Sequence, residues 1–126
     1  MLANPNLDAP IYVLVVEDEP LSRIYASNLV EDAGLVPIEA SNADEAISML
    51  ETRKDILIVF TDINLPGSMN GLKLAHAIRH RWPPIELILT SGRFNLKNSD
   101  LPERSRFFPK PYRAEEIISA LNGFAP

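Results

Sequence analysis

The sequence contains no cysteine, which excludes disulfide bonds and thiolate metal sites. No apolar run approaches the roughly 20 residues needed to cross a bilayer, and the N-terminus lacks the basic and apolar segments of a signal peptide. Basic residues are also few, since 12 Lys and Arg stand against 17 Asp and Glu, a net charge of −5. Nucleic-acid-binding surfaces normally need clustered basic side chains. We therefore expect a cytoplasmic protein that binds neither membrane nor nucleic acid.

The length and composition favour a single folded domain. A chain of 126 residues with 46% apolar residues can build one core. Residues 1–10 carry two prolines and two asparagines with little periodicity, which predicts a mobile N-terminal arm. From residue 11 strand-like and helix-like patterns alternate, so we place the domain at residues 11–124. The chain ends at Pro126, just past the last predicted helix, and we expect no output domain.

Short apolar runs predict strands buried on both faces, as in a parallel sheet. Five strands are predicted, at residues 11–16, 36–40, 56–61, 85–90 and 106–108, and Pro37 favours an edge position for the second. Four helices are predicted, at residues 20–33, from a cap at Ser41 or Asn42, from about 68–70 to 81, and from 114 onward. Gly34 fits the C-terminal cap of the first. Residues 92–105 hold few apolar side chains, so a fourth helix between the last two strands should be short or irregular. The fold class is α/β, a doubly wound five-stranded parallel sheet of order 2-1-3-4-5 with helices on both faces.

Polar residues stand at the carboxyl ends of four predicted strands: Glu17-Asp18, Asp62, Thr90 and Lys110. In such a sheet these ends form the ligand-binding crevice. Three converging carboxylates repel one another, and Mg²⁺, which prefers oxygen ligands, would offset that repulsion. With Lys110 the set has a formal charge of −2, which Mg²⁺ neutralises.

This set of groups suits phosphoryl transfer. A carboxylate can act as the nucleophile and form an aspartyl phosphate. The reaction depends mainly on alignment and on neutralising the phosphoryl oxygens. A hydroxyl from Thr90 and the ammonium of Lys110 are groups that grip such oxygens.

At these positions the sequence resembles the receiver domain of two-component response regulators, from about residue 11 to residue 121. The matching stretches are Val15-Val16-Glu17-Asp18-Glu19, Thr61-Asp62-Ile63-Asn64-Leu65-Pro66-Gly67, Leu89-Thr90-Ser91-Gly92 and Phe107-Phe108-Pro109-Lys110-Pro111-Tyr112. Each motif alone is weak, but four in order with suitable gaps make a specific pattern.

The resemblance implies a role for each matching residue. Asp62 would accept phosphate from the phosphohistidine of a sensor histidine kinase or phosphotransfer protein. Asp18 would bind Mg²⁺ directly and Glu17 through water, with Asp62 and the backbone carbonyl of Asn64 as further metal ligands. Thr90 and Lys110 would read the phosphate, and Phe107 stands at the position of the family's switch aromatic. The implied protein is a stand-alone signalling switch, a monomer or weak homodimer, that acts on an unidentified downstream protein.

Three features depart from the family pattern. The loop Gly67-Ser68-Met69-Asn70 looks one residue longer than usual, which should reshape one rim of the site. Phe107 has no hydroxyl, so a switch there must work by packing alone. The weak fourth helix differs from the family pattern, in which that helix forms part of the output face.

Other interpretations remain open from the residues alone. Asp62 could be an ordinary aspartate in a strand-to-helix loop, and Glu17, Asp18 and Glu19 could stabilise a helix N-terminus. The protein could instead be a phosphohydrolase with an aspartyl nucleophile, although Asp18-Glu19-Pro20 lacks the second aspartate that such enzymes carry two residues on. A scaffold that binds partners regardless of phosphorylation is a third possibility. Lys110-Pro111 is a candidate cis peptide bond.

Overall fold

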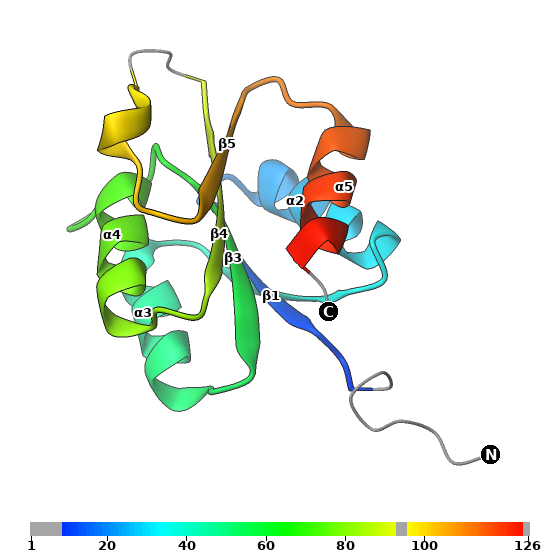
Figure 1. Ribbon diagram of the computed structural model, residues 1–126, viewed down its shortest axis with the longest axis horizontal. Coiled ribbons are helices and arrows are strands. Elements are labelled where there is room, and N and C mark those ends of the chain that lie inside the picture. Colours follow the sequence, from blue (N-terminus) through cyan, green and yellow to red (C-terminus); the bar gives the residue numbers. More distant parts are fainter. Residues whose placement is uncertain (1–8, 93–95, 125–126) are drawn as a thin grey trace.

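The computed structural model describes residues 9–92 and 96–124. Five parallel strands form one sheet in the order β2-β1-β3-β4-β5, which confirms the predicted fold class. Helices α3 and α4 lie on one face of the sheet, and α2 and α5 lie on the other (Figure 1). The elements are β1 (Tyr12–Val16), α2 (Pro20–Asp32), β2 (Val36–Ala40), α3 (Ala43–Thr52), β3 (Ile56–Asp62), α4 (Gly71–Arg81), β4 (Glu86–Ser91), the 3₁₀ turn η1 (Asn98–Asp100), β5 (Ser105–Pro109) and α5 (Ala114–Phe124). Of the predicted N-terminal arm, residues 1–8 lie outside the described part.

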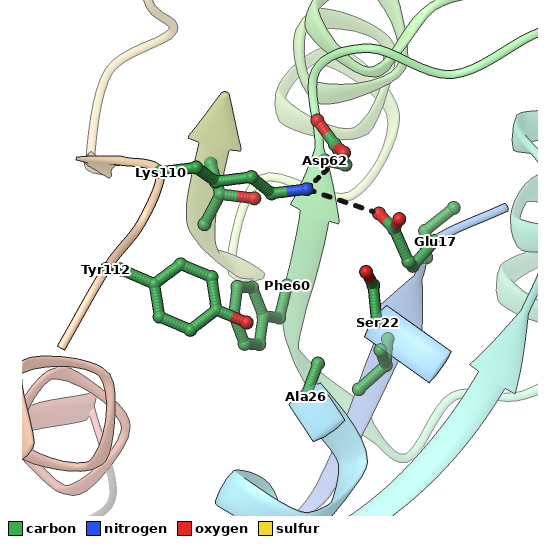
Figure 2. A pocket seen from close by; sticks show the side chains of 10 residues that line it. Glu17, Ser22, Ala26, Phe60, Asp62, Lys110 and Tyr112 are labelled. Atoms are coloured by element: carbon green, nitrogen blue, oxygen red, sulfur yellow. Dashed lines mark hydrogen bonds and ion pairs between the residues drawn. The ribbon is translucent and has the colours of Figure 1, made fainter. Parts of the chain in front are cut away.

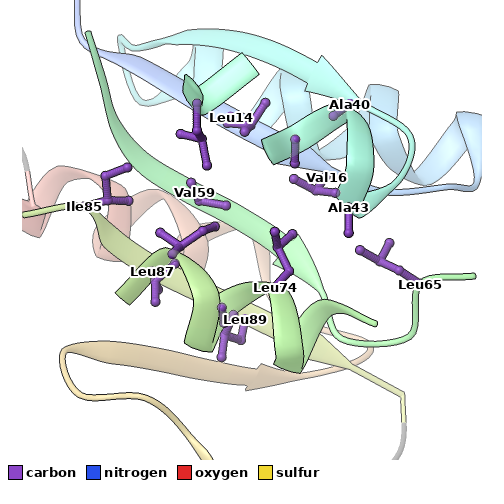
Figure 3. Close-up of a cluster of buried hydrophobic side chains, with 14 of the residues drawn as sticks. Leu14, Val16, Ala40, Ala43, Val59, Leu65, Leu74, Ile85, Leu87 and Leu89 are labelled. Carbon is purple, nitrogen blue, oxygen red and sulfur yellow. The ribbon is translucent and has the colours of Figure 1, made fainter. Parts of the chain in front are cut away.

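Two hydrophobic clusters fill the space between the sheet and its helices. Successive strand side chains point to opposite faces, so Leu14 and Val16 of β1 join the cluster under α3 and α4 (Figure 3). Val13 and Val15 join the cluster under α2 and α5. Because both faces of β1 are covered, the strand reads as an unbroken apolar run.

The strand order gathers the carboxyl ends of β1, β3, β4 and β5 at one edge of the sheet. Val16 of β1 pairs with Thr61 of β3, and Asp62 pairs with Thr90 of β4. Ser91 of β4 pairs with Pro109, next to Lys110. Residues far apart in the sequence therefore leave the sheet side by side.

Polar caps fix where the helices begin. The Asn42 side chain accepts a hydrogen bond from the Glu45 backbone N–H and caps α3, and Asn70 caps α4 in the same way. Gly34 has a φ of +84°, the left-handed conformation that suits the residue after a helix end. Strand β2, which contains Pro37, is an edge strand as predicted.

The connection between β4 and β5 contains, within its described residues, one 3₁₀ turn in place of a fourth α-helix. This confirms the sequence prediction. Helix α4 holds the connection through two side chains. The Arg79 guanidinium donates to the carbonyls of Glu103 at 2.7 Å and of Arg104 at 3.2 Å. A His76 Nε2 contact with the Asp100 carbonyl at 2.8 Å adds a third tie.

Arg79 also reaches the turn after its own helix, where Nη1 donates to the carbonyls of Pro83 and Ile85, both at 2.7 Å. One side chain thus joins two separate turns. Burial lowers the pKa of Arg79, but a guanidinium remains charged at any working pH.

Replacing Arg79 should therefore destabilise the fold. We expect Arg79→Ala to lower the free energy of unfolding by about 2–3 kcal/mol, because several carbonyls lose a charged donor at once. Arg81→Ala is the matched control, because its ion pair with Glu51 is exposed and worth less than about 1 kcal/mol. Chemical denaturation measures both, and equal losses for the two variants would contradict this role.

Candidate functional site

The carboxyl edge of the sheet brings Glu17, Asp62 and Lys110 together (Figure 2). The Lys110 ammonium Nζ lies 2.6 Å from Asp62 Oδ2 and 3.9 Å from Glu17 Oε2. The side chains of Glu17 and Asp62 are 9% and 7% exposed, whereas that of Lys110 is 31% exposed. A single ammonium therefore lies within ion-pair distance of two buried carboxylates.

The Asp62 carboxylate is held on both sides. Its Oδ2 accepts from Lys110, and its Oδ1 accepts from the Asn64 backbone N–H at 2.9 Å. The Asn64 side chain in turn donates to Ser91 Oγ at 3.2 Å, which ties the loop after β3 to β4. These contacts fix the direction in which the Asp62 carboxylate points.

Thr90 lies beside Asp62, since the two residues pair across β3 and β4 and Thr90 is buried. Thr90, Glu17, Asp62 and Lys110 line one small cavity of about 20 Å³. That volume is enough for about one water-sized group. The structure thus brings the four predicted strand ends to a single place.

The site holds more negative than positive charge. Burial, reinforced by the neighbouring Asp62 carboxylate, raises the pKa of Glu17 to about 7, and Lys110 only partly opposes this shift. The ionised form of Glu17 is thus disfavoured in the folded chain. A further cation near these acids would relieve that cost.

Two carboxylates of this kind suit Mg²⁺, which takes one or two of them and keeps several waters. The third predicted acid, Asp18, follows Glu17 in the chain but is exposed and does not line the cavity. Among residues 9–92 and 96–124, no group of three or more His, Cys, Asp or Glu side chains is arranged to hold a metal ion. Glu17 and Asp62 fit the ion by the kind of their donor atoms, and the full set with Asp18 and the Asn64 carbonyl stays a prediction.

Glu19 stabilises the N-terminus of α2, which is the structural alternative given above for the acidic turn. Its carboxylate accepts hydrogen bonds from the backbone N–H groups of Leu21 and Ser22 and caps α2. Those bonds lower the pKa of Glu19. Of the three acids in the turn, Glu19 belongs to the helix and Glu17 to the cavity.

The remaining predicted features lie around the cavity. Phe107 is partly buried against the cluster under α4, opposite Leu89 of β4, and its switching role stays a prediction. The Lys110–Pro111 peptide bond is cis, as the sequence suggested. In the loop after Pro66, Ser68 Oγ donates to the Asp44 carboxylate at 3.0 Å and so joins that loop to α3.

An open groove of about 620 Å³ adjoins the cavity on the side of α2. Its apolar walls come from Leu21 and Tyr25 of α2 and from Pro111 and Tyr112 after Lys110. The Tyr25 and Tyr112 rings stack with centroids 6.1 Å apart. Leu21 is 74% exposed and Tyr25 47% exposed, so the groove presents apolar surface beside the acids.

Gly71 positions Asp62, and the sequence interpretation missed it. A Cβ at Gly71 would lie 1.9 Å from the Asp62 carbonyl oxygen and 2.7 Å from Ile63 Cα. The helix α4 therefore begins in direct backbone contact with the end of β3, where the Gly71 N–H donates to the Ile63 carbonyl at 2.8 Å. The available signal was a glycine close to the predicted start of the helix, which the structure places at the first position of α4.

The model of the response regulator receiver domain matches residues 13–122. Among curated proteins, the nitrogen assimilation regulatory protein NtrX of Azorhizobium caulinodans is 30% identical over 110 residues, which are 84% of this chain and 24% of NtrX. The aerobic respiration control protein ArcA of Escherichia coli K12 is 37% identical over 84 residues, 67% of this chain and 34% of ArcA. The chain thus spans about a quarter to a third of the length of these two relatives.

Solved structures of response regulator receiver proteins also resemble this chain. A response regulator receiver protein from Sinorhizobium medicae has a TM-score of 0.85 at 25% identity, covering 94% of this chain and 96% of that one. One from Pseudomonas putida has a TM-score of 0.81 at 26% identity, covering 91% and 98%. In the part of the chain that the structure describes, no helix is long and apolar enough to span a membrane.

The backbone contact at Gly71 generates the first prediction for the site. Gly71→Ala should destabilise the fold by about 3 kcal/mol, because backbone atoms of β3 must move to admit the methyl group. Gly123→Ala in α5 is the matched control, since a Cβ there meets nothing within 4 Å. We expect the control to stabilise the fold by at most about 1 kcal/mol. Thermal unfolding measures both, and a harmless Gly71→Ala would contradict the contact.

The charge on Glu17 generates a pH-dependent prediction. Because its pKa is raised in the folded chain, the cost of ionising Glu17 is absent below its ordinary value of 4.5 and complete above about 7. Glu17→Gln should therefore raise the melting temperature, in buffer free of divalent cations, more at pH 8 than at pH 5. An equal effect at both pH values would show that Glu17 is not held in a site short of positive charge.

Proposed function

Because this chain belongs to the response regulator receiver domain family, we propose that it is a phosphorylation switch whose acceptor is Asp62. The observation that carries the proposal is the buried Asp62 carboxylate, held by Lys110 at 2.6 Å beside Thr90 and Glu17. The relatives are signalling regulators, and this chain acts in the same way in two-component signalling. Its phosphodonor is the phosphohistidine of a sensor histidine kinase or phosphotransfer protein.

The transfer step forms one bond and breaks one. An oxygen of Asp62 attacks the phosphorus atom, the bond from phosphorus to the histidine nitrogen breaks, and its electron pair stays on that nitrogen, which takes up a proton. Asp62 becomes an acyl phosphate. The Asn64 backbone N–H and Lys110 orient the carboxylate before the attack.

Lys110 and Thr90 respond to the new group. Once Asp62 carries the phosphoryl group, its oxygens hold less charge, so the Lys110 ammonium moves its contact to a phosphoryl oxygen. The Thr90 hydroxyl donates to another phosphoryl oxygen. Phe107, packed at the edge of the cluster under α4, then moves inward and changes the surface around β5.

A divalent cation bound by Glu17 and Asp62, with Asp18 and the Asn64 carbonyl as further ligands, would neutralise charge on the transferring phosphoryl group. The chain's own groups leave that charge unbalanced, since Lys110 faces two carboxylates. We therefore propose that phosphorylation depends on Mg²⁺.

The groove beside the cavity receives the phosphodonor protein. Exposed apolar surface of this kind marks interaction sites. Leu21, Tyr25 and Pro111 line the groove, and Lys110 belongs to both groove and cavity. A partner seated there has direct access to Asp62. The switch is a monomer or weak homodimer, and it dephosphorylates itself at most slowly.

One labelling experiment tests the proposal. The protein is incubated with acetyl phosphate and Mg²⁺, and its intact mass is compared with that of Asp62→Asn. We expect wild type to gain the mass of one phosphoryl group, labile to hydroxylamine, and Asp62→Asn to gain none. Chelating the divalent cation should suppress the gain.

Each other outcome contradicts the proposal in its own way. Rapid consumption of acetyl phosphate without a retained adduct would indicate a phosphohydrolase. No adduct under any condition would indicate a scaffold. An adduct on both proteins would place the acceptor at another residue.

A further inference from the structure

Arg23 lies outside the cavity but contacts the chain that forms it. It stands in the first turn of α2, and its side chain is 22% exposed. Its Nη1 donates to the Glu17 backbone carbonyl at 3.0 Å, and its Nε donates to Glu39 Oε1 at 3.2 Å. One guanidinium thus joins the end of β1 to β2.

The anchor of Arg23 is itself held in place. The second oxygen of Glu39, Oε2, accepts from Ser27 Oγ at 2.8 Å, and Ser27 is buried in α2. Glu39 lies on β2, which pairs with β1 through Val15. We refer to Arg23, Ser27 and Glu39 as the Arg23 brace.

The brace completes the fixation of the Glu17 backbone. The Glu17 N–H donates to the Ala40 carbonyl of β2 at 3.1 Å, and the Glu17 carbonyl accepts from Arg23. That carbonyl belongs to the peptide bond leading to Asp18. Both peptide groups of Glu17 are therefore held, which determines how Glu17 and Asp18 leave the strand.

We propose that Arg23 is a positioning residue that sets the Glu17-Asp18 turn for binding a divalent cation. This inference rests on the proposed function, since it assumes that the turn supplies metal ligands. Residues that orient ligands typically contribute 10–100-fold to metal affinity. Arg23 acts through the Glu17 carbonyl and touches neither the cation nor the phosphoryl group.

The direction of the effect separates positioning from simple electrostatics. Removing a positive charge near acids should tighten the binding of a cation if charge alone mattered. Removing the brace should weaken it, because the turn is no longer held. The two explanations therefore predict opposite changes in the dissociation constant for Mg²⁺.

Calorimetric titration with Mg²⁺ tests the proposal on the full chain. We expect Arg23→Ala to weaken binding about tenfold, and Arg81→Ala, which removes the same charge from an exposed ion pair, to change it less than about twofold. Arg23→Lys keeps the charge, but a single ammonium cannot reproduce the fork between two acceptors. Arg23→Lys should therefore also weaken the binding of Mg²⁺. Its melting temperature should be closer to that of wild type than the melting temperature of Arg23→Ala is.

A variant cycle with Glu39 adds a second criterion. In a Glu39→Ala background, Arg23→Ala should lower the affinity for Mg²⁺ less than it does in wild type, because the brace is already broken. Arg23→Lys or Arg23→Ala binding as tightly as wild type, or more tightly, would overturn the positioning role while leaving the proposed function intact. A wild-type chain that fails to bind Mg²⁺ at millimolar concentration would overturn both.

Discussion

The structure of this site depends on one ammonium group that must offset two carboxylates. Lys110 lies 2.6 Å from Asp62 and 3.9 Å from Glu17, so one partly exposed ammonium faces two buried carboxylates. Two such carboxylates cannot both ionise cheaply, and the pKa of Glu17 is raised because of its burial and of Asp62. This excess of negative charge favours the binding of a cation beside Glu17 and Asp62. It gives a physical reason for a divalent cation and for a ligand whose oxygens Lys110 can grip.

The rest of the fold holds these three groups at one edge. The strand order brings the ends of β1, β3 and β5 to the same edge, and the absence of a side chain at Gly71 lets α4 begin against Asp62. Arg79 of α4 secures the connection that leads into β5, and Lys110 directly follows that strand. Backbone contacts of this kind matter because a buried charged group tolerates little displacement before its partners are lost.

Local patterns in the sequence were enough for the fold and for the proximity of Glu17, Asp62, Thr90 and Lys110; the roles of these residues stay predictions. Apolar runs ending in a polar residue identified the strands, and parallel pairing then required Glu17, Asp62, Thr90 and Lys110 to meet. Contacts between distant side chains could not be read in this way. Asp18 is exposed, so two buried acids stand where the sequence predicted three converging ones. The Gly71 contact depends on the approach of a helix to a strand, which periodicity does not encode.

Lys110 and a divalent cation would both offset the negative charge of Glu17 and Asp62, so each reduces the electrostatic gain from the other. Calorimetric titration of Lys110→Met with Mg²⁺ tests it most directly, because the substitution removes the ammonium and keeps much of the side-chain volume. We expect Mg²⁺ to bind Lys110→Met more tightly than wild type, by a factor of about 3–10 after allowance for the exposure of Lys110. Unchanged or weaker binding would contradict it.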